Sequence, residues 1–392
     1  MKIQVVKMRI TRLIVTRFAL VCFAFLLAAC GPVEKNQASS ALQMANGESV
    51  TRGTELVFPK DHGIHAEQGI EWWYLTANLQ SESGETFGVQ WTLFRTLMPS
   101  NIESTWWDNN LYFAHFAMQH NQEHVAFERF SRAGQAKVTS SPFNAAIDNW
   151  QLSSINENFL PLNLTAAHEN YQVALALSDS PMILHGDNGY SQKTQSGHAS
   201  YYFSYPFLKV KGSLTFAGQT YKVTGNAWYD REWSASLLDK NQLGWDWFSL
   251  VDSQSDKAEE SDSKGLMLFC IRGNKNRADP IAEPKVEQSS RDNNELGNGT
   301  NYDYCRGTRI AHDGTATDIS KDSIKLIVVE TVTIDNHDYP SKWQVELPNT
   351  PAIIIESITK DSRNKLTIPY WEGRVKSTGG FNGIGYAEIT GY

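Results

Sequence analysis

An internal repeat is the feature that most constrains how this chain can fold. Five residue types recur with identical spacing after 165 residues: Val210, Lys211, Phe216, Gly218 and Tyr221 return as Val375, Lys376, Phe381, Gly383 and Tyr386. Each copy ends in a Thr-Gly pair, which aligns Gly225 with Gly391. A second repeated pattern, in the same order, lies earlier in each half, where a Gly and an Arg are seven residues apart: Gly88 to Arg95 and Gly265 to Arg272. A repeat at this distance is typical of a duplicated domain.

The hydrophobic pattern indicates that the repeated unit is made of strands. Apolar side chains alternate with others at Phe87, Val89, Trp91 and Leu93, which is the period of a β-strand, whereas helical periodicity is scarce. Gly and Asn-Gly signals separate such runs, and many short strands favour a barrel or a sandwich. We therefore predict an all-β chain with two tandem antiparallel barrels, at residues 53–230 and 231–392.

The N-terminal segment has the pattern of a bacterial lipoprotein signal. Five basic residues precede an apolar run at 18–27, which is shorter than the about 20 residues of a spanning helix. Residues 27–30 (LAAC) form a lipobox, so we predict removal of residues 1–29 and lipidation of Cys30. Residues 30–52 are small and polar and suit a flexible tether. Gly31, in place of an aspartate, predicts a periplasm-facing lipoprotein of the outer membrane of a Gram-negative bacterium.

The net charge of the chain limits the kinds of molecule that it can bind. The chain has 35 Lys and Arg against 43 Asp and Glu, a net charge of −8. Five of the basic residues and none of the acids precede Cys30, so the processed chain would carry −13. A nucleic-acid partner is excluded because phosphate neutralisation needs a basic surface. Membrane contact is expected through the lipid anchor alone.

Two further cysteines, Cys270 and Cys305, lie in two strand-like runs separated by a very polar stretch. If the runs are antiparallel neighbours in an oxidising compartment, the two residues can form a disulfide. The alternative is a pair of buried free thiols, and the sequence leaves both open.

Tryptophan and acid lie close together along the chain: ten of the 12 tryptophans are within two residues of an Asp or Glu. Aromatic rings lower the local dielectric, which raises the pKa of a neighbouring carboxyl, and their faces attract cations. The alternative is that each Trp fills a core while the acid lies on the opposite face of the strand. The candidate ligand-binding residues are Trp73, Trp228, Trp233, Trp245, Trp247 and Glu71.

Other chemistries have weaker support. The histidines near Asp61 and Glu67, and those at 115–124, do not follow a zinc spacing, so we predict no metal and no other cofactor. There is no Gly-x-Ser-x-Gly elbow for a serine hydrolase. Glu71, Asp246 and Glu372 would suit glycoside cleavage only if the fold paired them at the required separation.

Long motifs in order along the chain carry a family resemblance: FPKDHGIHAEQGIEWWYLTANL, GVQWTLFR, LYFAHFAMQH, LHGDNGYSQK, ASYYFSYPFLKVKGSL, VTGNAWYDREW, GWDWFSL and YWEGRVKSTGGFNGIGYAEITGY. Together they resemble the carotenoid hydratase (hydroxyneurosporene synthase) family and its AttH-like relatives, over nearly the whole chain after the tether. The relatives include predicted secreted hydrolases and lipoproteins encoded with ABC-transporter permeases. The resemblance implies two lipocalin-like barrels.

The resemblance also implies a catalytic acid. An Asp in the motif that matches WYDREW is the proposed proton donor of the hydratases, and here that position is Asp230. Trp228 shares its strand face, whereas Tyr229 and Arg231 point the other way in a regular strand. A salt bridge to Arg231 would depress the pKa of Asp230 and make the motif a structural hinge, so this alternative stays open.

Two functions follow. In the first, an apolar isoprenoid or lipid-like molecule binds in an aromatic pocket and its alkene is hydrated. Asp230 would act as general acid, Trp228 with Trp245 or Trp247 as cation-stabilising walls, and His115 or Tyr229 would orient the water. In the second, the same pocket carries a lipid for an ABC export system without catalysis. A fold alone cannot separate the two.

Overall fold

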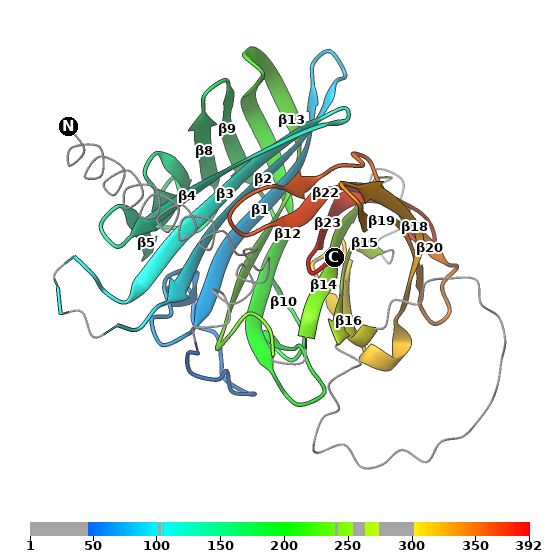
Figure 1. The fold of residues 1–392 in the computed structure, drawn as a ribbon, viewed down its shortest axis with the longest axis horizontal. Coiled ribbons are helices and arrows are strands. Elements are labelled where there is room, and N and C mark those ends of the chain that lie inside the picture. The colour runs from blue at the N-terminus through cyan, green and yellow to red at the C-terminus, as the bar shows by residue number, and fades with distance from the viewer. Residues whose placement is uncertain (1–45, 101–102, 105, 240–241, 254–262, 274–301) are drawn as a thin grey trace, which may run out of the picture. The chain divides into compact units, whose positions relative to one another are not determined.

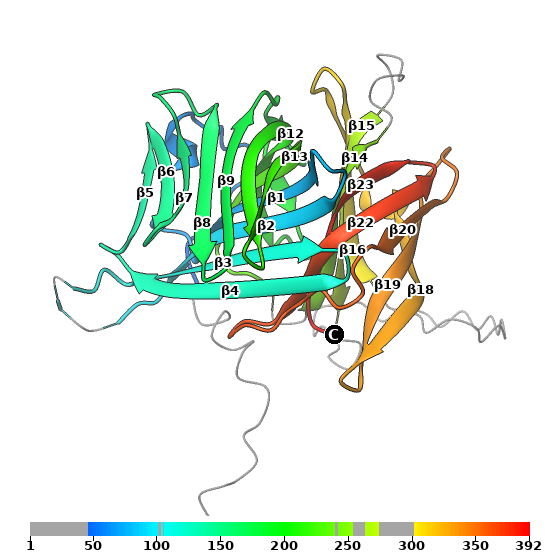
Figure 2. The ribbon, with the colours of Figure 1, turned by 90° about the horizontal axis from the view of Figure 1, so that it is seen from above.

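The described chain consists of two antiparallel β-sheets, each curled into a barrel (Figure 1, Figure 2). The computed structural model describes residues 46–100, 103–104, 106–239, 242–253, 263–273 and 302–392. The predicted signal at 1–29, Cys30 and most of the predicted tether lie outside these ranges. The helices within them are two short 3-10 turns, Lys60–His62 and Lys321–Ser323. No helix in the described ranges is long and apolar enough to cross a membrane.

The first sheet has 13 strands, and its main path runs β4-β3-β2-β1-β13-β12-β9-β8-β7-β6-β5. Two short strands, β10 and β11, also pair with β12. The bounds are β1 (Ile70–Ser81), β2 (Thr86–Leu97), β3 (Asn110–His120), β4 (Glu123–Arg132), β5 (Ala136–Ser140), β6 (Phe143–Ile147), β7 (Trp150–Ser154), β8 (Leu162–His168), β9 (Tyr171–Ser178), β10 (Ile183–Leu184), β11 (Tyr190–Gln192), β12 (Ala199–Phe216) and β13 (Gln219–Ser234).

The second sheet has 10 strands, in the order β17-β16-β15-β14-β23-β22-β20-β19-β18, and β21 also pairs with β22. This path matches, strand by strand, the part of the first sheet's path that runs from β4 through β1 and β13 to β7. The predicted duplication and the all-β class are therefore confirmed. The bounds are β14 (Gln242–Asp252), β15 (Ser263–Gly273), β16 (Tyr302–Ala311), β17 (Ala316–Ile319), β18 (Lys325–Ile334), β19 (His337–Glu346), β20 (Ile353–Ser357), β21 (Arg363–Asn364), β22 (Tyr370–Gly379) and β23 (Gly383–Ile389).

The register of the repeated hairpin corrects the sequence alignment. Val210 lies opposite Gly225, whereas Val375 lies opposite Gly385, because the second hairpin is shorter. The structural counterpart of Gly225 is therefore Gly385, and the predicted match with Gly391 is wrong. Both positions need glycine: a Cβ would lie 2.1 Å from the Asn78 carbonyl oxygen in the first barrel and 1.7 Å from the Ser249 carbonyl oxygen in the second.

Buried apolar side chains form three clusters. One fills the interior of the first barrel and includes Trp73 and Trp233, and a second fills the interior of the second barrel around Trp343. The third draws residues from both barrels, such as Trp228 of β13 and Phe269 of β15, and lies between them. We call this third region the interbarrel interface. Strand alternation sends successive residues of one strand to an interior and to this interface.

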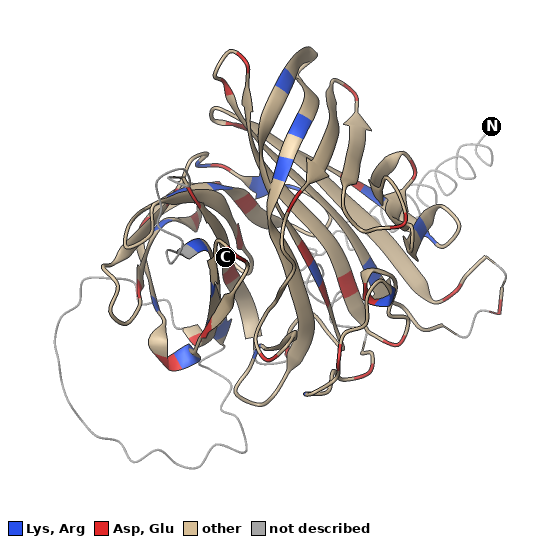
Figure 3. Ribbon diagram, turned by 180° about the vertical axis from the view of Figure 1, so that it is seen from behind, with Lys and Arg blue, Asp and Glu red and all other residues tan. Residues whose placement is uncertain are grey.

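Charged residues lie within the strands as well as in the loops (Figure 3). Several of them are buried: Glu71, Arg95, Asp230, Arg231, Asp246, Arg272, Glu372 and Arg374. Buried charges are rare unless they are paired or functional, so each one needs a partner or a role.

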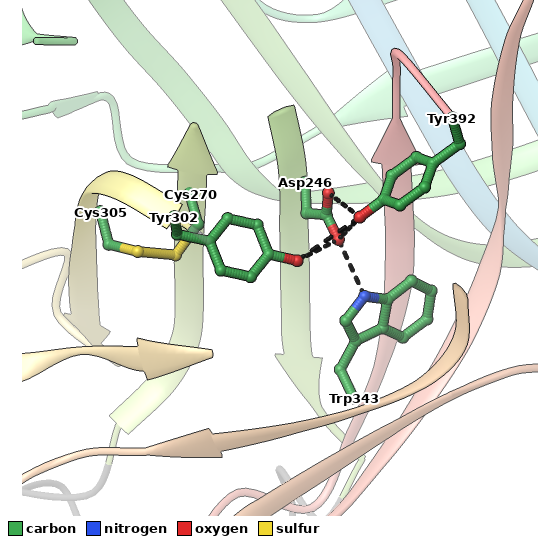
Figure 4. Close-up of a disulfide and its surroundings, with 6 residues drawn as sticks. All are labelled: Asp246, Cys270, Tyr302, Cys305, Trp343 and Tyr392. Carbon is green, nitrogen blue, oxygen red and sulfur yellow. Dashed lines mark hydrogen bonds between the residues drawn. A yellow bond between two sulfur atoms is a disulfide. The ribbon is translucent and has the colours of Figure 1, made fainter. Parts of the chain in front are cut away.

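One predicted boundary and one possible disulfide can now be compared with the structure. The strand β13 continues to Ser234 within the first sheet, four residues beyond the predicted division after residue 230. Cys270 and Cys305 are directly opposite in β15 and β16 and form a disulfide, which is the first of the two alternatives (Figure 4).

Candidate acid site at the interbarrel interface

The two faces of β13 serve different regions. Tyr229, Arg231 and Trp233 point into the first barrel, where Tyr229 and Trp233 belong to its apolar core. Trp228 and Asp230 point toward the second barrel, and Trp228 belongs to the apolar cluster of the interbarrel interface. The predicted alternation along the WYDREW motif is therefore confirmed.

Asp230 is buried at this interface, with 3% of its surface exposed. Its Oδ1 accepts hydrogen bonds from Trp228 Nε1 at 2.7 Å and from the Ser204 hydroxyl, and Tyr202 is a further hydrogen-bond partner of the carboxyl. Among the ion pairs of the described ranges, none includes Asp230. Burial, with the nearby charge of Glu232, raises the pKa of Asp230 to about 7, despite the hydrogen bonds that lower it.

Arg231 does not neutralise Asp230, so the hinge alternative is wrong. Its guanidinium points into the first barrel, where Nη2 pairs with Glu71. Arg95 pairs with the other oxygen of the same carboxylate. Although burial opposes ionisation, the two guanidinium groups hold the pKa of Glu71 well below its usual range. Glu71 is thus a buried, ionised and paired carboxylate.

Ser204 connects Asp230 to the second barrel. It lies opposite Asp230 in the β12–β13 register and contacts His185 Nε2 at 2.7 Å. His185 directly follows β10, and its Nδ1 lies 2.8 Å from the hydroxyl of Thr308 in β16. Burial lowers the pKa of His185 to about 3, so the ring is neutral at physiological pH.

Aromatic side chains of both barrels surround the acid. Trp247 of β14 donates to the Tyr202 hydroxyl at 3.2 Å and packs edge-on against Tyr74, with ring centroids 5.5 Å apart. Trp245 and Trp247 are partly exposed, whereas Tyr74, Tyr202 and Trp228 are buried.

Two more carboxyl groups reach the interface from the second barrel. Glu372 of β22 accepts a hydrogen bond from Tyr74, and burial raises its pKa well above the usual value. Glu388 of β23 accepts from Trp245 Nε1 at 2.7 Å, and burial raises its pKa to about 7. Three carboxyl groups whose pKa is raised, with no cation paired to them in the described ranges, thus share one aromatic environment.

The predicted ligand-binding residues fall into two groups. Trp228, Trp245 and Trp247 lie at the interbarrel interface with Asp230. Trp73, Trp233 and Glu71 lie inside the first barrel, where Arg231 stacks over both tryptophan rings at 4.1 and 4.8 Å. The six candidates therefore do not form one ligand-binding site, because neighbouring strand positions face opposite sides of the barrel wall.

Neither side chain predicted to orient water lies beside the carboxyl of Asp230. Tyr229 is fully buried inside the first barrel beside Phe159 and Tyr205, on the face opposite Asp230. His115 faces the interbarrel interface rather than a barrel interior, and its Nδ1 contacts Tyr370 at 2.9 Å, not Asp230.

The three carboxyls considered for glycoside cleavage lie in three separate places. Glu71 is inside the first barrel and Glu372 at the interface. Asp246 is inside the second barrel, where Trp343, Tyr302 and Tyr392 donate to it at 2.9, 2.8 and 2.7 Å (Figure 4). No pair of them forms a dyad, so this chemistry is not supported.

Sequence reasoning missed Tyr202, Ser204 and His185, although all three lie in motifs that carry the family resemblance. The segment ASYYFSYPF did carry a signal, because Tyr202 and Ser204 are two residues apart and therefore lie on the same face of a strand. Their proximity to Asp230 depends on the pairing of β12 with β13, which the local pattern does not reveal.

Comparisons with known proteins agree with this architecture. The AttH-like family model matches residues 49–299 and 293–392. A putative AttH from Nitrosomonas europaea is 28% identical, with a TM-score of 0.72, over 88% of this chain and 99% of that chain. Kievitone hydratase from Nectria haematococca is 14% identical, with a TM-score of 0.59, over 88% of this chain and 97% of that chain, a likeness of fold alone. No curated protein matches. The chain is thus a member of the AttH-like family.

Proposed function

We propose that this protein adds water to an alkene of an apolar, isoprenoid or lipid-like molecule at the interbarrel interface, with Asp230 as the proton donor. The observation that carries the proposal is the state of Asp230: a buried carboxyl that forms no ion pair within the described ranges, among aromatic rings, with a pKa of about 7. A general acid works best when its pKa is close to the working pH. A likeness of fold to a protein named as a hydratase supports the same reaction class.

The reaction balances with the groups present and one water. The Asp230 O–H bond breaks as its proton forms a C–H bond with one alkene carbon, which leaves a carbocation on the other carbon. Rings such as Trp228 and Trp247 stabilise this cation, and so does the new carboxylate. A water oxygen then bonds to the cation and its surplus proton returns to Asp230. The product is an alcohol heavier by one water.

The surroundings favour a neutral, branched substrate. Lys193 lies over the Tyr202 ring at 4.9 Å, and it is already paired with Glu232 at 2.7 Å, so it is not available for an anionic head group. A trisubstituted alkene of the isoprenoid type forms a tertiary cation, which is the most stable product of protonation. The partly exposed Trp245 and Trp247 provide apolar surface for the chain of such a molecule.

The test is a hydration assay with an unsaturated isoprenoid, geranylgeraniol, in isotopically labelled water, with the product detected by mass spectrometry. Asp230→Asn should lower the rate by about 100-fold or more, because removal of a general acid typically costs that much. Asp318→Asn, which changes a partly exposed carboxylate of the second barrel, is the matched control and should keep the wild-type rate. Equal rates for wild type and Asp230→Asn would overturn the proposal.

The lipid anchor at Cys30 and the outer-membrane location remain part of the proposal. The matching test is Cys30→Ser, which should abolish lipid attachment and remove the protein from the outer-membrane fraction. A lipid carrier for an ABC exporter is the competing function at the same interface. In that case Asp230→Asn would leave both ligand binding and export intact.

A further inference from the structure

A continuous hydrogen-bond chain joins Asp230 to the second barrel. Thr308 contacts His185 Nδ1 at 2.8 Å, His185 Nε2 contacts Ser204 at 2.7 Å, and Ser204 donates to Asp230 Oδ1. All four side chains are at most 3% exposed. Burying a neutral imidazole and two hydroxyls costs free energy unless each group is hydrogen-bonded. No step of the acid reaction described above uses His185 or Thr308.

The direction of this chain follows from the donors available. Trp228 Nε1 can only donate, and it donates to the same Oδ1 that faces Ser204. A carbonyl oxygen accepts two donors better than a protonated oxygen does, so Oδ1 is the acceptor and the Ser204 hydroxyl points toward it. Ser204 must then accept from His185, whose proton lies on Nε2. The Nδ1 atom is left as acceptor for the Thr308 hydroxyl.

We propose that Ser204, His185 and Thr308 are positioning residues that hold the transferable proton of Asp230 on Oδ2 and hold Oδ1 as its acceptor. The catalytic consequence rests on the proposed hydratase function, whereas the placement of the proton does not. Because Thr308 belongs to β16, the second barrel helps to orient the acid of the first. The packing of the two barrels against each other thereby becomes a determinant of acid strength.

Nearby charges also influence the titration of Asp230, apart from the hydrogen-bond chain. The titratable groups that interact with Asp230 are Tyr229 and Glu232 on its own strand, Tyr202 on β12, Tyr74 on β1 and Glu372 on β22. Lys193 acts on His185. None of these groups changes in the variants below, so a shift in titration reports on the hydrogen-bond chain.

Isotope-edited infrared spectroscopy of the full-length protein can test the proposal, with Asp230→Asn as the reference that isolates the Asp230 carbonyl band. In the wild type the protonated band should disappear with a midpoint near the pKa of about 7. Ser204→Ala removes a donor that stabilises the carboxylate, so its midpoint should rise by about 1 to 2 pH units. Thr308→Val should shift it upward by less, and Thr308→Ser should restore it.

The same variants give a second readout in the hydration assay. The pH at which kcat falls should move upward with the infrared midpoint, and KM should stay within about twofold because the apolar contacts are retained. An unshifted midpoint in a folded Ser204→Ala protein, as judged by its thermal unfolding, would overturn the positioning role. If the wild type shows no hydration but the midpoint moves as expected, the proposed function fails and the hydrogen-bond chain stands.

Discussion

Asp230 and Arg231 are neighbours on one strand, and they belong to two electrostatic environments. On the interior face of β13, Arg231 and Arg95 enclose Glu71 and keep its carboxylate ionised. On the interface face, Asp230 is also buried, but it accepts from the neutral donors Trp228 and Ser204, and its pKa rises to about 7. Burial is common to both carboxyls, so the cationic partner decides the protonation state.

The paired carboxylate of Glu71 and the carboxyl of Asp230 differ in what they contribute to the protein. A buried carboxylate paired with two guanidinium groups satisfies its charge, and such a cluster fixes the geometry of the barrel wall. A buried carboxyl without a cation is unfavourable to ionise, and the same residue volume could be filled by an apolar side chain. The interbarrel interface holds three carboxyl groups, Asp230, Glu372 and the half-buried Glu388, that form no ion pair within the described ranges, which is a pattern expected of a functional site.

The largest expected effect lies on the interior face. Arg231→Met leaves the buried Glu71 with one of its two cations and should lower the free energy of unfolding by about 3–5 kcal/mol. Chemical denaturation measures this change. Arg306→Met breaks the partly exposed pair with Asp318 and is the matched control, with an expected loss of about 0–1 kcal/mol. Equal losses for the two variants would show that the interior cluster is not a stabilising unit.

A smaller effect distinguishes the tyrosines on the two faces. Tyr202→Phe removes a hydrogen-bond partner of Asp230 and should lower the hydration rate by about tenfold. Tyr229→Phe changes a hydroxyl inside the first barrel and should alter the rate by less than about twofold, since that side chain does not reach the acid. The steady-state rates of the two purified variants provide the measurement. A reversed order would place the reaction inside the first barrel instead.

Much of this difference was predictable from the sequence, and the missing part has a physical cause. Strand periodicity and the repeat predicted two barrels, and alternation placed Trp228 with Asp230 and Arg231 on the other face. The surroundings of the acid were not predictable. Ser204 meets Asp230 through the register of β12, whereas Thr308 reaches His185 and Glu372 reaches Tyr74 only when the second barrel packs against the first. Sequence pattern encodes the face on which a residue lies, but not what covers that face.

The free energy of unfolding as a function of pH, measured for wild type, Asp230→Asn and Glu71→Gln, tests the comparison most directly. The pKa of Asp230 is raised, so its contribution to stability is fully present below about pH 4 and is lost as the pH rises through about 7. Wild type should therefore lose about 1.4 kcal/mol per pH unit relative to Asp230→Asn across that window. The pKa of Glu71 is lowered, so its contribution is present above about pH 4 and is lost as the pH falls below it.

We predict that the two differences from wild type change with pH in separate windows, Asp230→Asn between about pH 4 and 7 and Glu71→Gln below about pH 4. A difference between wild type and Asp230→Asn that is constant from pH 4 to 8 would contradict it, because Asp230 would then be ionised in the folded protein as it is in the unfolded chain.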